Sequence, residues 1–302
     1  MLPLETRFCG LAGIHLALRS APSPDYLAQL EAARGRAFGS GRLALIRMGD
    51  PPIRVWVHDR GRRGGYRFQC TARAGRETWL FKQPVSGTGW DSRFEFRCRS
   101  GKPLSAADVA RRLQHISRAL GVRSGVMSVS RLDFAVELLM PPDFEVNPTR
   151  FSTHSRARLR RDLSHRSSAI SDDYRLHATW LARRISAVTI GRLPGREIEL
   201  SRLPLPNQKP SHLNPLQIPP PHDEWWRVDI RLGKKHLREV HKFNEFHDIG
   251  VRAIGLFRRA VTSVRYLADG NLALNISRHP THPFWIGVQR AGLKSLEAER
   301  WP

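Results

Sequence analysis

The feature that most constrains this chain is an alternating stretch at residues 130–139. Successive side chains of a β-strand point to opposite faces, so every second residue shares a face. The first face would carry Leu132, Phe134, Val136 and Leu138, and the second Arg131, Asp133, Ala135 and Glu137. The stretch therefore predicts a strand that packs one face on a core and presents two carboxylates and an arginine on the other.

Two further segments, residues 93–97 and 227–231, share the order basic, apolar, acidic, apolar, basic. Gly-Lys follows each segment, at Gly101 and Gly233, and a helical pattern comes next in both. This is a weak internal duplication of strand, turn and helix. If the three strands lie in one sheet, their acids converge on one face; these acids are Glu95, Asp133, Glu137 and Asp229.

Converging carboxylates raise one another's pKa unless a cation or an arginine lies between them. A divalent ion such as Mg²⁺ or Mn²⁺ suits such a set, because both ions prefer oxygen ligands. We therefore predict metal ligands at Asp133, Glu137 and Asp229, with Glu95 as a weaker candidate. The alternative is a half-buried strand with a solvated charged face, since charged residues mostly stay in water.

The charge of the chain indicates a polyanionic partner. Its 302 residues carry 50 Lys and Arg against 27 Asp and Glu, a formal net charge of +23. A globular chain this basic usually meets nucleic acid. An anionic membrane surface is a weaker alternative, because no long basic amphipathic helix is evident. Arginine-rich codon usage without function is a third reading.

Cysteine usage and hydropathy predict a cytoplasmic protein. The three cysteines show no paired spacing, which fits a reducing compartment rather than a disulfide framework. No apolar run approaches the length of a membrane span. We expect no membrane partner.

The pattern along the chain predicts an α+β fold with a mostly antiparallel central sheet and flanking helices. Helices are expected at residues 23–38, 105–120 and 249–266, and short strands over much of the remainder. We divide the chain into an N-terminal half, residues 1–122, and a C-terminal half, residues 123–302, which together form one compact unit. The two halves would be similar strand–turn–helix units.

Several basic residues are candidates for phosphate contacts. The densest run is His154-Ser-Arg-Ala-Arg-Leu-Arg-Arg161. The complete candidate set is Arg131, Arg156, Arg158, Arg160, Arg161, Arg196, Lys234 and Lys235. From residue 203 to 221 the composition changes to a proline-rich one, which predicts extended or irregular chain.

Five segments occur in an order similar to the replication initiation factor family, which includes rolling-circle initiators of plasmids and filamentous phages. They are residues 130–138, 154–157, 188–196, 226–237 and 282–285. The likeness covers about residues 125–285. It implies a metal-dependent DNA nickase and strand transferase, with origin DNA and host replication proteins as partners. A tyrosine would attack a phosphate and stay joined to the 5′ end while a divalent ion stabilises the charge.

Carried onto this chain, the resemblance matches Asp133 and Glu137 to the acidic strand, and Asp229 to a position where the family usually has glutamate. The departure concerns the nucleophile. Where the family generally has Tyr-Asp-Lys, this chain has Ser201, Arg202 and Leu203. Ser201 and Tyr174 are the remaining candidates for a nucleophile, and no nearby residue in the sequence activates Ser201.

Three explanations of the missing tyrosine stay open. The segment around residues 199–222 is frameshifted, or the chain binds DNA without nicking it, or the nucleophile is displaced. The overall prediction is an initiator-like DNA-binding protein with little or no covalent nicking. The alternatives are a non-catalytic DNA-binding regulator and a basic protein-interaction module.

Overall fold

The computed structural model describes residues 5–83, 90–98, 102–121, 127–141, 144–153, 160–162, 175–181, 184–203, 224–268 and 279–298. One twelve-stranded sheet dominates it. In sheet order its strands are β2 (Ala44–Met48), β3 (Ile53–Val57), β4 (Tyr66–Ala72), β5 (Glu77–Lys82), β6 (Ser92–Arg97), β1 (Thr6–Leu18), β7 (Met127–Met140), β13 (Glu224–Gly233), β12 (Arg196–Leu203), β11 (Arg184–Gly191), β10 (Arg175–Leu181) and β9 (Arg160–Asp162). Neighbours are antiparallel except β9 and β10, which confirms the predicted mostly antiparallel α+β fold.

The strand order repeats in the two halves of the sheet. In each half the first strand, β1 or β7, lies innermost, and the last strand, β6 or β13, pairs with it. The remaining strands run outward in reverse order to β2 or β9. The two innermost strands pair with each other and join the halves. The repeated segments predicted from the sequence are β6 and β13, which occupy equivalent places in this arrangement.

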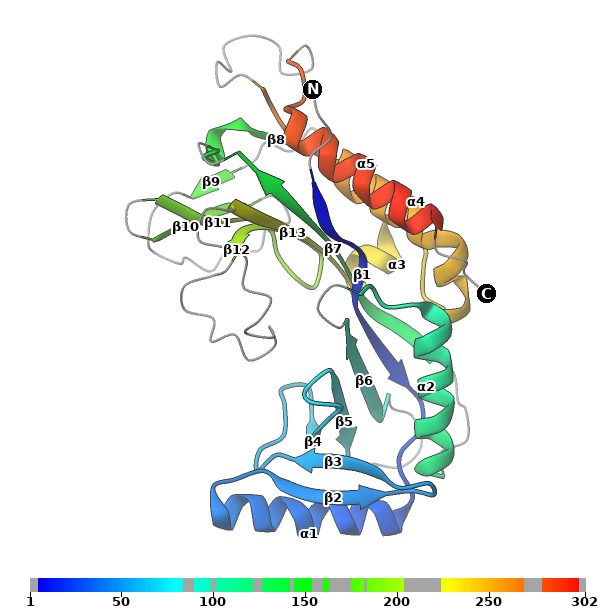
Figure 1. Ribbon diagram of the computed structural model, residues 1–302. Helices are drawn as coiled ribbons and strands as arrows, with labels where there is room; N and C mark the ends of the chain where they lie inside the picture. Colours follow the sequence, from blue (N-terminus) through cyan, green and yellow to red (C-terminus); the bar gives the residue numbers. More distant parts are fainter. Residues whose placement is uncertain are drawn as a thin grey trace.

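Five α-helices occur in the described residues: α1 (Pro24–Ser40), α2 (Ala106–Ala119), α3 (Lys234–Glu239), α4 (Ile249–Thr262) and α5 (Pro283–Ala298). Figure 1 shows α2 to α5 along one side of the sheet and α1 beneath β2 and β3. None of these helices is both long enough and apolar enough to cross a membrane. Two short strands, β8 (Phe151–Thr153) and β14 (Val264–Tyr266), form a separate pair.

The helix starts follow from their capping residues. The Ser23 hydroxyl accepts a hydrogen bond from the backbone of Tyr26 at the start of α1, and Ser105 accepts one from Asp108 at the start of α2. The predicted helix over 249–266 is too long by four residues. The chain leaves α4 at Ser263, because residues 264–266 pair with β8 as strand β14.

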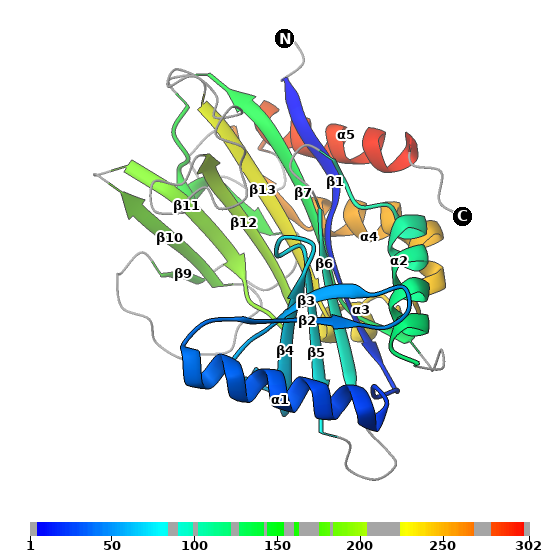
Figure 2. The ribbon, with the colours of Figure 1, turned by 60° about the horizontal axis from the view of Figure 1, so that its bottom comes forward.

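The strands present two different faces. One face packs its apolar side chains against the helices, as where Phe134 meets Phe257 of α4 with ring centroids 5.8 Å apart. The opposite face, here called the open face, carries Arg131, Asp133 and Glu137 of β7, and no helix of the described residues covers it (Figure 2). The polar residues that the sequence singled out therefore lie on one surface.

Candidate functional site

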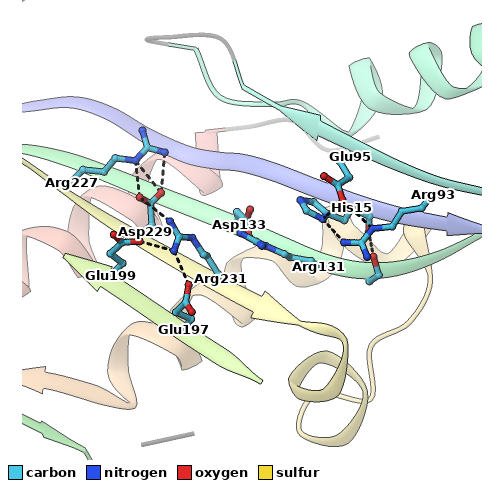
Figure 3. A network of polar contacts seen from close by, with 11 residues as sticks. His15, Arg93, Glu95, Arg131, Asp133, Glu197, Glu199, Arg227, Asp229 and Arg231 are labelled. Carbon is cyan, nitrogen blue, oxygen red and sulfur yellow. Dashed lines mark hydrogen bonds and ion pairs between the residues drawn. The ribbon is translucent and has the colours of Figure 1, made fainter. Parts of the chain in front are cut away.

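The middle of the open face is a ladder of arginines and carboxylates on three neighbouring strands (Figure 3). We call it the central ladder; its members are Arg131, Asp133 and Glu137 on β7, Arg227, Asp229 and Arg231 on β13, and Glu197 and Glu199 on β12. Directly paired residues of antiparallel strands share a face, and Glu137 pairs with Arg227 while Asp133 pairs with Arg231. The strand register therefore places acids beside arginines.

Arg227 connects two of the predicted metal ligands. Its Nη1 atom donates to Glu137 Oε1 at 2.7 Å, and its Nε atom donates to Asp229 Oδ1 at 2.9 Å. Burial disfavours the charged form of Arg227, but Asp229 and Glu137 more than offset this, so the pKa of its guanidinium is raised. Both carboxylates thus meet a permanently charged cation from their own sheet.

Arg231 holds together the acids of the next two strands. Its Nη1 atom lies 2.6 Å from Glu197 Oε1 and 2.6 Å from Glu199 Oε2, and its Nη2 atom lies 3.8 Å from Asp229 Oδ2. Glu199 and Asp229 are direct cross-strand partners, an arrangement that alone would be repulsive. The Arg231 guanidinium between them removes the repulsion.

Asp133 is bound by its own strand. Arg131 Nε donates to Asp133 Oδ1 at 2.5 Å. Burial nevertheless raises the pKa of Asp133, and the nearby arginines only partly oppose that effect. Gly13 of β1 lies opposite, and a Cβ atom there would come within 2.9 Å of Asp133 Oδ2. The missing side chain at Gly13 is what gives this carboxylate its room.

A second polar cluster lies on β1 and β6, the equivalent strands of the N-terminal half. Arg62 Nη1 donates to both Glu95 carboxylate oxygens at 2.8 Å, and Arg93 Nε lies 3.2 Å from Glu95 Oε1. His15 Nδ1 lies 2.7 Å from Arg93 Nη2, so it accepts that hydrogen bond as a neutral imidazole. Burial, reinforced by Arg93 and Arg131, holds the pKa of His15 well below its usual value. This cluster also pairs its acid with arginines.

The donor set fits a divalent ion poorly. Within the described ranges, no group of three or more His, Cys, Asp or Glu side chains is close enough together to hold a metal. The four predicted ligands Glu95, Asp133, Glu137 and Asp229 lie on one face, as expected, but each carboxylate already contacts at least one guanidinium. From the sequence, either a metal ion or an arginine could separate these acids. In the structure, arginines lie between them.

Ser201, at the position of the family's tyrosine, lies next to this ladder. It is buried on β12 and pairs directly with Arg227 of β13. The structure thus places Ser201 next to the arginine that binds Glu137 and Asp229, although these residues are far apart in sequence. A guanidinium cannot accept a proton at ordinary pH, so Arg227 supplies no base for a serine nucleophile. Tyr174 lies outside the described residues.

The candidate phosphate-contacting residues separate into groups. Arg131 belongs to the central ladder and is paired with Asp133. Arg160 and Arg161 lie on β9, where only the backbone is described, and Arg156 and Arg158 fall outside the described residues. The other three, Arg196, Lys234 and Lys235, come together.

The turn before Arg196 packs against the start of α3. Gly233 N–H donates to Gly195 O at 2.8 Å, and Lys235 N–H donates to Pro194 O at 3.2 Å. A Cβ atom at Gly233 would lie 2.2 Å from Pro194 O, so only glycine permits this approach. The buried Arg196 side chain then reaches the Ser263 hydroxyl at the end of α4.

The result is a basic surface formed by α3, α4 and the segment between them. We call it the α3–α4 surface; its exposed basic side chains are Lys234, Lys235, Lys242, Arg252, Arg258 and Arg259. Residues 234–262 contain seven Lys and Arg against three Asp and Glu. The surface is therefore cationic, unlike the central ladder, in which carboxylates outnumber arginines.

Two half-buried histidines lie side by side at the α3–α4 surface. The Nε2 atoms of His236 and His241 lie 3.1 Å apart, and one must donate while the other accepts. Burial, His241 and Arg196 lower the pKa of His236 to about 4, and burial followed by Arg259 lowers that of His241. Burial is the main reason that both imidazoles stay neutral, and the nearby arginines add to it.

Sequence reasoning missed the contributions of His15, Arg227 and Arg231. The arginines were visible in the repeated basic–acidic–basic segment, but only strand register shows which acids they hold. His15 lies in a mostly apolar run that was not assigned as a strand. A single polar residue in such a run is the one signal that could have drawn attention to it.

Comparison with known proteins gives a similarity in structure but none in sequence. No family model and no curated protein matches the chain. A solved structure described as a rolling circle replication initiator protein from Geobacillus stearothermophilus aligns with 94% of this chain and 97% of its own. The TM-score is 0.46 and the sequence identity 10%.

Proposed function

We propose that this protein binds DNA through charge on the α3–α4 surface and acts as an initiator-like replication protein with little or no nicking activity. The observation that carries the proposal is that the 192–196 turn packs against the start of α3 while Arg196 reaches Ser263 at the end of α4. Arg252 of α4 also donates to the backbone oxygen of His241, in the segment that follows α3. Lysine and arginine contacts to phosphate supply most of the sequence-independent affinity for DNA.

The condition of the central ladder supports the reduced nicking. Phosphate attack by this chemistry requires a carboxylate-held ion and an aimed nucleophile. In this chain arginines neutralise Glu137 and Asp229, and serine stands where the family has tyrosine. Loss of a nucleophile normally lowers the rate by orders of magnitude even when the rest of a site survives.

The binding test is fluorescence anisotropy with a labelled duplex or hairpin over 50–200 mM salt. Bound cations release counterions, so we expect the logarithm of affinity to fall linearly with the logarithm of salt. Each phosphate contact removed in Lys234→Ala or Lys235→Ala should reduce the slope by about 0.9. The matched control is Arg36→Ala, which removes an equally exposed charge from α1.

A flat salt response would contradict the proposal and favour a basic protein-interaction module. An equal change in Lys235→Ala and Arg36→Ala would instead show that net charge, and not the α3–α4 surface, determines binding.

The nicking test incubates the protein with supercoiled origin DNA and Mg²⁺ or Mn²⁺ and looks for protein joined to a 5′ end. We expect no robust adduct from the wild-type chain. Specific hairpin binding without an adduct favours the regulator alternative. If an adduct forms and Ser201→Ala abolishes it, serine is the nucleophile; if Tyr174→Phe abolishes it, the nucleophile is Tyr174.

A divalent ion at Asp133, Glu137 and Asp229 stays a prediction. Its direct test is the electron paramagnetic resonance spectrum of Mn²⁺ titrated into the protein, with Asp229→Asn as the comparison. Because Arg227 already holds two of the three acids, we expect weak binding that strengthens when Arg227 is replaced by a neutral residue.

A further inference from the structure

The outermost strands of the N-terminal half carry an exposed patch of two arginines, a tryptophan and a leucine. We call it the edge patch; its members are Leu45 and Arg47 on β2 and Arg54 and Trp56 on β3. Leu45 pairs with Trp56, and Arg47 pairs with Arg54, so all four side chains share one face. Trp56 and Leu45 are each 44% exposed, and both arginines are exposed.

The edge patch belongs to the open face and not to the helix face. The alternate residues of β3, Ile53, Val55 and Val57, are buried in the core that includes α1. Strand register continues Trp56 across the sheet in one row, through Thr71, Thr78, Glu95, His15 and Arg131. The patch is therefore the far end of the same sheet face that holds the central ladder, about 24 Å away when measured along the sheet at a strand spacing of about 4.8 Å.

The pairing of Arg47 with Arg54 is unfavourable without a ligand. Like charges directly opposite each other on a sheet destabilise it. Neither arginine has an ion pair with any residue in the part of the chain that the structure describes. In the same sheet the central ladder neutralises every arginine it contains, so the uncompensated pair at the edge marks a place suited to an anion.

The tryptophan beside this pair favours an anion that also carries an aromatic base. An exposed aromatic ring on an open sheet face is a surface on which a base can stack, and every base has a suitable face. Such stacking needs an unpaired base, because bases inside a duplex already stack on their neighbours. Arg54 precedes Trp56 by two residues on the same strand face, about 6.6 Å away along the strand. A single nucleotide could thus stack its base on Trp56 and place its phosphate against Arg54.

A second copy of this chain fits the edge patch less well. Two copies meeting through Leu45 and Trp56 would bring together four guanidiniums without an acid between them. β2 is the edge strand of the sheet, and its two residues in the edge patch, Leu45 and Arg47, supply no acid that could offset these charges. Charge complementarity therefore favours a polyanion with unpaired bases.

We propose that the edge patch is a binding platform for single-stranded nucleic acid, in which a base stacks on Trp56 and the adjoining phosphates lie against Arg47 and Arg54. This deepens the proposed DNA binding but uses residues separate from the α3–α4 surface. Each site can therefore fail without the other.

The experiment measures affinity for a labelled oligothymidylate, which has no secondary structure, and for a blunt duplex. Trp56→Ala should weaken binding to the single strand by about 5- to 150-fold, the range expected for loss of one stacked base. Trp56→Phe, which keeps an aromatic face, should retain most of the affinity. Duplex affinity should change less than twofold in both variants.

The arginines are tested by the salt dependence of single-strand binding. The double variant Arg47→Ser and Arg54→Ser should reduce the salt slope by about 1.4, which is about 0.7 for each phosphate contact on a single strand. The control Arg36→Ala lies on α1, on the other side of the same strands, and should leave the slope unchanged. Because all three side chains are exposed, thermal melts should confirm that the variants fold.

Three results would overturn the proposal. One is unchanged oligothymidylate affinity in Trp56→Ala. Another is an equal loss in Arg36→Ala. The third is a wild-type dimer in sedimentation that Trp56→Ala converts to monomer without a change in single-strand affinity, which would make the patch a protein interface. An oligouridylate measured in parallel distinguishes RNA from DNA as the preferred strand. Loss of duplex binding in Lys235→Ala with single-strand binding intact would leave this proposal standing.

Discussion

The central ladder and the edge patch both carry arginines on the same sheet face, but these arginines have opposite surroundings. In the ladder, Arg227 and Arg231 each contact more than one carboxylate, so their charge is compensated within the fold. At the edge, Arg47 and Arg54 face each other without an acid in the described residues. The difference teaches that the net charge of +23 does not locate a binding surface. What locates it is which arginines the fold leaves uncompensated.

The largest effect should come from breaking the ladder at Arg227. In Arg227→Ala the carboxylates of Glu137 and Asp229 lose their main cation while remaining largely shielded from water. We expect the free energy of unfolding to fall by about 3 kcal/mol, at the low end of the range for a broken buried pair because the guanidinium is partly exposed. Urea denaturation measures the loss. Arg227→Lys, which keeps the charge but not the two-sided fork, should lose less.

The opposite outcome is equally informative for Arg227. A loss below 1 kcal/mol would mean that the acids find solvent or each other easily, and that the ladder is not a structural unit.

A smaller effect is expected from closing the space beside Asp133. In Gly13→Ala the new Cβ atom would lie 2.9 Å from Asp133 Oδ2 and would displace the carboxylate from Arg131. We expect the free energy of unfolding to fall by about 2 kcal/mol, typical of overpacking. The matched control is Gly255→Ala on α4, where a Cβ atom meets nothing within 4 Å. A similar loss in both variants would attribute the effect to the backbone.

The third prediction concerns pH and the neutral histidine between the two halves. His15 is neutral in the fold because its pKa is lowered, whereas in the unfolded chain it titrates near 6.5. Below about pH 6.5 the unfolded state therefore binds a proton that the folded state does not, and stability falls as the pH falls. Above that pH the neutral His15 costs no stability. Below it, the free energy of unfolding falls by at most about 1.4 kcal/mol for each pH unit.

Urea denaturation of wild type and His15→Asn between pH 7.5 and about 5 tests this assignment. The variant should show a shallower fall in the free energy of unfolding with pH. Parallel curves for wild type and His15→Asn would assign the pH dependence to other buried histidines.

The smallest expected effect is a gain in stability at the edge patch. Arg47→Glu converts the like-charged pair with Arg54 into an opposite-charged one, which should raise the free energy of unfolding by about 0.5 kcal/mol. The same variant should bind oligothymidylate more weakly. A gain in stability with a loss of binding would show that the repulsion is retained for function. A variant that is less stable than wild type would remove the argument from repulsion.

The strands that alternate were predictable, and the buried one was not. In residues 130–138 and 227–231 polar and apolar residues alternate, because one face of each strand packs on the core and the other belongs to the polar open face. β1 shows no such alternation. Most of its residues are buried, since α5 covers one side and a small apolar cluster of Phe8, Ala12 and Ala135 fills part of the other. A strand buried on both faces loses the period that identifies it.

The starts of α1 and α2 were also predictable from the sequence, but the end of α4 was not. Serine is a favoured capping residue, and Ser23 and Ser105 cap the helices that begin directly after them. The end of α4 depends on β14 pairing with β8, more than a hundred residues earlier in the chain. Helical periodicity carries no information about such a distant partner.

For the candidate site, the sequence by itself determined which acids would share a face, because a period of two leaves no choice once the strands are known. It also determined that serine, not tyrosine, stands at position 201. Only the tertiary structure decided that arginines from the same strands neutralise those acids and that Arg47 and Arg54 are left facing each other. The reason is physical: the energy of a charge depends on its neighbours within a few ångströms, and strand register, not sequence order, chooses those neighbours.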